Sequence, residues 1–129
     1  MPIVHLSLIQ GRKQEEKKAL LDLVHQALVE AFGIPEHDRT QRITEYPPED
    51  FEFPPGKSAA YLVVEISAFA GRSPEAKGRL YQKIAQGLTS LGQDPQDLMI
   101  LLNEQPPVNW GLRGGQRGDQ IALGFEVKV

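Results

Sequence analysis

The feature that most constrains this chain is an internal repeat. Compared with itself at an offset of 60 residues, the sequence aligns 3–39 with 63–99 without a gap, and ten of the 37 pairs are identical. The identical pairs are Val4/Val64, Ser7/Ser67, Gly11/Gly71, Arg12/Arg72, Glu15/Glu75, Lys17/Lys77, Leu20/Leu80, Gln26/Gln86, Leu28/Leu88 and Pro35/Pro95. A gapless match of this length indicates a duplicated unit of about 60 residues.

Each copy begins and ends with a pattern typical of a strand. Apolar residues alternate along residues 3–9 and again along 62–68, as expected of strands with one buried face. A second strand is predicted after each helix, over Arg39–Glu45 and over Leu98–Asn103. The first of these is polar and is expected near a solvent face or a subunit boundary. The second is apolar and is expected to be buried on both faces.

A helix is predicted between the two strands of each copy. The first carries an apolar stripe from Leu20 to Ala31 and is ended by Gly33, which suits a left-handed cap. The second begins at the N-cap Ser73, followed by Pro74 in the first turn. Its interior glycines, at positions 78 and 87, each cost about 1 kcal/mol relative to alanine, which weakens the expectation of a continuous helix.

These elements predict an α+β fold in one domain, residues 1–129, with pseudo-repeats at 3–45 and 62–103. Right-handed crossovers make two tandem βαβ units, which join into a four-stranded sheet with both helices on one face. The other sheet face is left uncovered, and we expect a partner subunit to cover it. Residues 46–58 are expected to link the units, and residues 121–129 to form a short final strand.

Composition excludes several classes of protein. The chain has 129 residues, 40% of them apolar, a net charge of −3 and no cysteine. An acidic balance argues against a nucleic-acid partner, and no apolar run approaches the roughly 18 residues of a membrane span. Absence of cysteine excludes disulfides and thiolate chemistry. We expect a cytoplasmic domain that binds neither nucleic acid nor membrane.

Several short stretches resemble the tautomerase superfamily, whose members use an amino-terminal proline. They are the opening Met-Pro-Ile-Val, the Leu-Ile-Gln-Gly-Arg that ends the first strand, and the Ile-Thr-Glu of the second. Together with the repeat, the spacing of Asp38 and Arg72 is similar to malonate semialdehyde decarboxylase and its relatives. The resemblance covers most of residues 2–110. It implies the fold of 4-oxalocrotonate tautomerase and macrophage migration inhibitory factor, and a homotrimer whose sheets face inward.

Pro2 carries the chemistry in that superfamily. Once Met1 is removed, Pro2 becomes a secondary amine, and α-amino groups ordinarily titrate near 7.7–8.0. Burial of the charged form lowers that pKa further. Such an amine is a general base at neutral pH, or a general acid if its pKa stays high. Proline at this position also simply permits methionine excision, so Pro2 by itself is a weak signal.

Two arginines begin the predicted helices. Arg72 is expected to bind a substrate carboxylate and to stabilise enolate charge. By resemblance it matches the second of two arginines in the decarboxylase pattern, and Ala70 stands where the first would be. Arg12, its repeat partner, matches the substrate-holding arginine of short 4-oxalocrotonate tautomerases. The alternative for both arginines is a surface ion pair with Glu15 or Glu75.

Three further residues complete the candidate site. Asp38 matches, by resemblance, the acid that activates water or orients the substrate carboxylate, although Asp is also common in turns. Arg39, from a neighbouring chain, is a further candidate for holding the carboxylate. Trp110 matches an apolar wall over the amine, or else anchors its loop. His5 and His25 are not at metal-ligand spacing, and we expect neither metal nor cofactor.

The sequence therefore favours a small enzyme acting on a 2-oxo or 3-oxo carboxylic acid. In a keto–enol tautomerase, neutral Pro2 would move a proton between carbon and oxygen while Arg72 holds the carboxylate. In a decarboxylase or hydratase, cationic Pro2 would polarise the carbonyl and Asp38 would handle water or the leaving carboxylate. A non-catalytic trimeric scaffold of the same fold is the remaining alternative.

Overall fold

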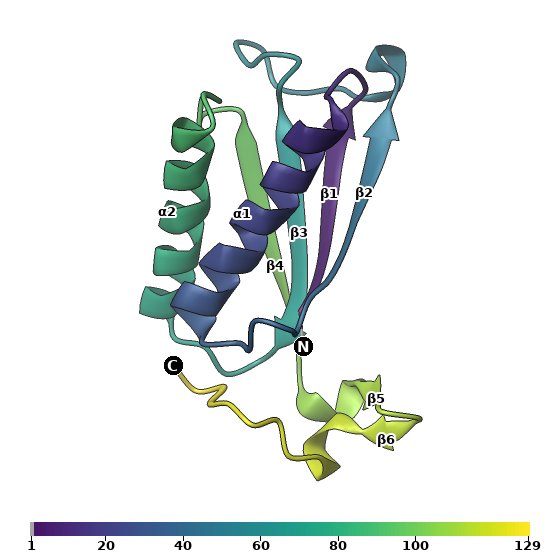
Figure 1. The fold of residues 1–129 in the computed structure, drawn as a ribbon, viewed down its shortest axis with the longest axis vertical. Coiled ribbons are helices and arrows are strands. Elements are labelled where there is room, and N and C mark those ends of the chain that lie inside the picture. The colour runs from purple at the N-terminus through teal and green to yellow at the C-terminus, as the bar shows by residue number, and fades with distance from the viewer. Residues whose placement is uncertain (1) are drawn as a thin grey trace.

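A computed structural model describes residues 2–129 as two layers, a four-stranded sheet and a pair of helices on one of its faces (Figure 1). The main elements in chain order are β1 (Ile3–Ile9), α1 (Gln14–Phe32), β2 (Thr40–Tyr46), β3 (Leu62–Phe69), α2 (Pro74–Ser90) and β4 (Leu98–Gln105). Short elements follow β2 and β4: η1 (Pro48–Asp50), η2 (Pro107–Asn109), β5 (Gly111–Leu112), β6 (Gln116–Arg117) and η3 (Gly118–Gln120).

The sheet topology confirms the duplicated βαβ unit. The strand order is β2-β1-β3-β4, with each unit contributing one parallel pair and with β1 antiparallel to β3 at the centre. Contacts repeat as well. Lys17 of α1 pairs with Glu45 at a distance of 2.8 Å between Nζ and Oε1, and Lys77 of α2 pairs with Glu104 at the equivalent place. The duplication therefore extends to side chains between helix and sheet.

The helices end where the sequence predicts, and both are continuous. Gly33 closes α1 in the left-handed conformation, with φ of 70°. Ser73 caps α2 by accepting a hydrogen bond from the backbone N–H of Ala76 at 3.1 Å. The interior glycines do not interrupt α2, which is continuous from Pro74 to Ser90. Gly87 faces α1, at a point where a side chain would overlap Leu23. That glycine lets the two helices approach closely.

The core lies between the helices and one face of the sheet. Val4, Leu6 and Leu8 of β1 are fully buried there, as are Val64 and Ile66 of β3. β2 is an edge strand whose residues are half-buried or exposed, in agreement with its polar sequence. Burial of the apolar face of each element supplies most of the stabilising free energy.

The prediction that the last long strand is buried on both faces was wrong for the single chain. Burial alternates along β4, and Met99 and Leu101 are 52% and 49% exposed. The reason is geometric, since both helices cover the same sheet face and leave these side chains on the open one (Figure 1). An apolar strand that looks doubly buried in sequence thus marks an uncovered surface.

The predicted final strand was also wrong. Residues 121–129 form no regular secondary structure and run back toward the start of α2 (Figure 1). Gly124 has a φ of +80°, which turns the chain in the middle of the expected strand. Alternating side chains in this segment therefore pack against the body of the protein without a strand partner.

Candidate active site

Pro2 is buried at one end of the sheet, beside a small cavity. The cavity has a volume of about 200 Å³. Its lining residues are Pro2, Ile3, Asp38, Thr40, Trp110 and Leu112. Three of the residues singled out in the sequence thus line one cavity. Its size suits a small acid rather than a polymer.

The strand directions explain why these distant residues meet. β1 and β2 are parallel, so Pro2 and Asp38, which precede them, lie at the same end of the sheet. β3 is antiparallel to β1, so its last residues arrive at that end too, followed by the corner that carries Arg72. β4 runs with β3 and delivers the loop of Trp110 (Figure 1). The site end of the sheet therefore gathers residues from both repeats.

Arg72 is buried with most of its hydrogen-bonding capacity unused. It is 6% exposed, and its Nη1 donates to the carbonyl oxygen of Phe69 at 3.1 Å. Its guanidinium carbon lies 4.7 Å from the centre of the Phe32 ring. Burial lowers the pKa of Arg72, and the Glu104 carboxylate opposes that shift. A guanidinium pKa is so high that Arg72 stays charged.

The unsatisfied polar atoms around Phe69 are all donors. Within residues 2–129, the buried side-chain N and O atoms without a hydrogen-bond partner are Nε and Nη2 of Arg72 and Nε1 of Trp110. Both residues contact Phe69, whose ring meets the Trp110 ring edge-on at 5.1 Å between centres. Buried N–H groups are seldom left unpaired, and each costs about 1–3 kcal/mol. This end of the sheet therefore favours an acceptor, such as a carboxylate.

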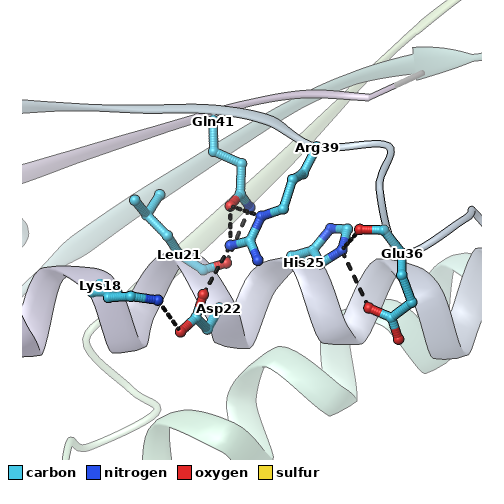
Figure 2. A network of polar contacts seen from close by, with 7 residues as sticks. All are labelled: Lys18, Leu21, Asp22, His25, Glu36, Arg39 and Gln41. Atoms are coloured by element: carbon cyan, nitrogen blue, oxygen red, sulfur yellow. Dashed lines mark hydrogen bonds and ion pairs between the residues drawn. The ribbon is translucent and has the colours of Figure 1, made fainter.

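Asp38 reaches the cavity through a turn after α1. Its backbone N–H donates to the carbonyl of Pro35 at 3.0 Å. The same turn is fastened by His25, which is buried in α1 and shares a hydrogen bond of 2.8 Å between Nε2 and the Glu36 carbonyl (Figure 2). From the sequence, His25 was considered only as a possible metal ligand, and its hydrogen bond to this turn was not predicted. A histidine amid an apolar helix stripe was the available signal.

Arg39 does not line the cavity within the chain. Its Nη2 donates to Oδ1 of Asp22 at 2.9 Å and to Oε1 of Gln41 at 2.8 Å. Figure 2 shows the guanidinium beside α1, bound to these two side chains. The prediction that Arg39 holds a substrate carboxylate therefore applies only to the site of a neighbouring chain.

Arg12 lies at the opposite end of the sheet from Pro2, as its repeat position requires. Its Nη2 donates to the carbonyl of Ala60 at 2.9 Å, and burial lowers its pKa. Asp97 precedes β4 as Asp38 precedes β2, and it accepts hydrogen bonds from the backbone N–H and the Oγ–H of Ser58 at 2.9 and 2.6 Å. At this end of the sheet, Ser58 and Ala60 therefore take up hydrogen bonds of Asp97 and Arg12, the repeat counterparts of Asp38 and Arg72.

Two absences hold for the described part of the chain. No group of three or more His, Asp or Glu side chains there could hold a metal ion. Among residues 2–129, neither helix is long and apolar enough to cross a membrane.

A family model described as a tautomerase enzyme matches residues 38–113, and a second with the same description matches residues 2–57. The chain belongs to the tautomerase family, whose members are enzymes of the isomerase type.

Particular relatives resemble the chain over most of its length. Probable tautomerase YrdN of Bacillus subtilis (strain 168) is 31% identical, and the match covers 90% of this chain and 94% of that protein. A structure of malonate semialdehyde decarboxylase superposes with a TM-score of 0.83 and 28% identity, over 88% of this chain and 92% of the other. A symmetric trimer of a fused 4-OT gives a TM-score of 0.81 and 27% identity, over 91% and 96% of the two chains.

Proposed function

We propose that this protein is a keto–enol tautomerase of small 2-oxo or 3-oxo carboxylic acids, with the amine of Pro2 as its base. The observation that carries the proposal is a buried proline in a cavity that Asp38 and Trp110 also line. Arg72 is not among the lining residues, but it lies at the same end of the sheet, buried and charged, with two unpaired N–H groups. Met1 lies outside the described residues, and the proposal requires its removal, because an acylated Pro2 nitrogen has no basicity.

Each group has one task in this reaction. The amine of Pro2 takes a proton from the enol oxygen or the substrate carbon and returns one to the other position, so that protons balance. Burial disfavours the protonated amine, which keeps it a base near neutral pH. Arg72 binds the carboxylate, and charge that develops on the enolate is stabilised by the same cation.

The apolar side of the cavity supports the same assignment. Trp110 and Leu112 follow β4 in the chain and line the cavity beside Pro2, where their apolar surface would exclude water from the amine. A dry site strengthens the attraction between Arg72 and an anionic substrate. A free N–H on Trp110 adds a donor for a substrate oxygen.

A homotrimer is part of the proposal. The fused 4-OT relative is a trimer, and the open sheet face here carries exposed Met99 and Leu101. In a trimer with sheets facing inward, these side chains would be buried. Arg12 and Arg39, which lie away from Pro2 in one chain, would then be available to a neighbouring chain's site.

The test compares processed protein with a version that carries extra residues before Pro2. We expect the processed protein to speed ketonisation of phenylenolpyruvate, and a 3-halopropiolate to label Pro2 covalently, as judged by mass spectrometry. The extended version should do neither. Equal ketonisation by both proteins would show that Pro2 is not the base.

Decarboxylation or hydration is the second candidate. The structural relative at TM-score 0.83 is a malonate semialdehyde decarboxylase with decarboxylase and hydratase activities, and Asp38 lines the same cavity as Pro2. In that reaction Pro2 is cationic and polarises the carbonyl, while Asp38 directs water or the departing carboxylate. Ala70 in place of a first arginine favours the tautomerase instead. A protein inactive on both kinds of substrate would support the trimeric scaffold.

A further inference from the structure

The C-terminal segment, residues 121–129, folds back over the corner between β3 and α2. Ser73 donates its Oγ–H to the carbonyl of Val129 at 2.9 Å. Val127 packs so closely on Gly71 that its Cγ1 lies 3.0 Å from where a Cβ would stand on that glycine. Figure 1 shows the C-terminus beside the start of α2. The segment is therefore attached to the residues on either side of Arg72.

Phe125 in this segment contacts the guanidinium itself. The guanidinium carbon of Arg72 lies 5.9 Å from the centre of the Phe125 ring, and the Phe32 ring is on the same group at 4.7 Å. An aromatic face attracts a cation at such distances without occupying any N–H donor. Two rings thus hold the charge of Arg72 while its Nε and Nη2 stay unpaired.

From these contacts we infer that Phe125 is a positioning residue for Arg72. It covers the guanidinium from water and holds it in an orientation that leaves Nε and Nη2 without a protein acceptor. Glu104 does not compete for those groups, because its carboxylate pairs with Lys77. This role rests on the proposed function, in which Arg72 binds the carboxylate. Phe32 is part of the buried core, whereas Phe125 is half-buried and can be changed with less risk to folding.

The first measurement does not depend on catalysis. Phenylglyoxal modification of Arg72 is followed by mass spectrometry, with exposed Arg79 of the same protein as the internal reference. We expect Phe125→Ala to accelerate modification of Arg72 several-fold relative to Arg79. Leu123→Ala, a change of similar kind in the same segment, should leave the ratio as in wild type. An unchanged ratio in Phe125→Ala would overturn the inference.

The second measurement separates positioning from simple cover. With phenylenolpyruvate as substrate, Phe125→Ala should raise KM about tenfold and change kcat less. With the methyl ester of phenylenolpyruvate, which lacks the carboxylate, the variant and the wild type should have the same kcat/KM. Phe125→Tyr keeps the aromatic face and should restore KM, while Phe125→Leu should not. Equal KM values for the Leu and Tyr variants would contradict the role of the ring. If the wild-type protein itself has no activity on phenylenolpyruvate, the proposed function fails, and the modification ratio still decides on Phe125.

Discussion

At the scale of single residues, Arg72 is the side chain whose burial most needs a functional reason. The guanidinium makes one hydrogen bond and two ring contacts. We expect Arg72→Ala to lower kcat/KM for an enol acid by about 10²–10³, because the developing charge loses its cation. Steady-state ketonisation measures this. Arg79→Ala removes an exposed arginine from α2 and should have no effect. Full activity of Arg72→Ala would place the carboxylate elsewhere, with Arg12 or Arg39 of a neighbouring chain to be tested next.

Asp38 separates the two proposed reactions. Proton transfer between carbon and oxygen needs the amine and the carboxylate holder, so Asp38→Asn should keep ketonisation within about tenfold, or roughly 1.4 kcal/mol. Decarboxylation or hydration uses the acid itself, and the same change should cost about 10²–10⁴. Both rates can be measured on one preparation. A loss of ketonisation as large as that of decarboxylation would contradict this division of roles.

At the scale of elements, the two glycines inside α2 differ in what surrounds them. Nothing lies within 4 Å of a Cβ placed on Gly78, whereas one on Gly87 would stand 1.8 Å from Cδ1 of Leu23. Gly78→Ala should therefore stabilise the protein by about 1 kcal/mol through helix propensity. Gly87→Ala should lose that gain, because Leu23 must move and the contact between the helices loosens. Urea unfolding at one protein concentration compares them. A Gly87→Ala as stable as Gly78→Ala would show that the helices do not need the glycine.

The linker between the repeats has a pH-sensitive anchor. Asp97 is 5% exposed, and hydrogen bonds from the side chain and backbone of Ser58 lower its pKa. The folded state therefore favours the carboxylate, and its stabilising contribution is complete above the ordinary Asp pKa near 3.9. It is lost as the pH falls through the lower folded value. The difference in urea midpoint between wild type and Asp97→Asn should thus shrink from pH 5 to pH 3. Parallel midpoints over that range would contradict the anchor.

At the scale of the whole molecule, the open sheet face is where we expect the proposed trimer to form. Leu101→Glu places a charge among side chains that a trimer would bury, and it should convert the assembly to monomers of 14.3 kDa. Leu91→Glu is the matched control, since Leu91 is 50% exposed but lies at the end of α2. Light scattering at micromolar concentration should give three times the monomer mass for wild type and for this control. A wild-type monomer would contradict the trimer.

The local structure could be predicted from the sequence because its signals are local. Alternating apolar residues predicted β1 and β3, the 3-4 stripes predicted both helices, and Ser73 and Gly33 marked helix ends. The gapless repeat added the topology, since two equal βαβ units with right-handed crossovers leave few ways to form one sheet. Pro2, Asp38 and Trp110 are candidates on sequence grounds alone, and all three line one cavity.

Only the tertiary structure decided which of these residues meet. Arg12 and Arg72 both follow a glycine at equivalent positions of the repeat, but the antiparallel pairing of β1 with β3 sends them to opposite ends of the sheet. Arg12 then donates to the carbonyl of Ala60, while Arg72 keeps two unpaired donors. The contact of Phe125 could not be found from the sequence pattern, because alternation along residues 121–129 predicted a strand and the segment forms none. Its contact with Arg72 depends on a turn at Gly124 and on distant packing. Periodicity reports the burial of one element, whereas a site depends on where several elements end.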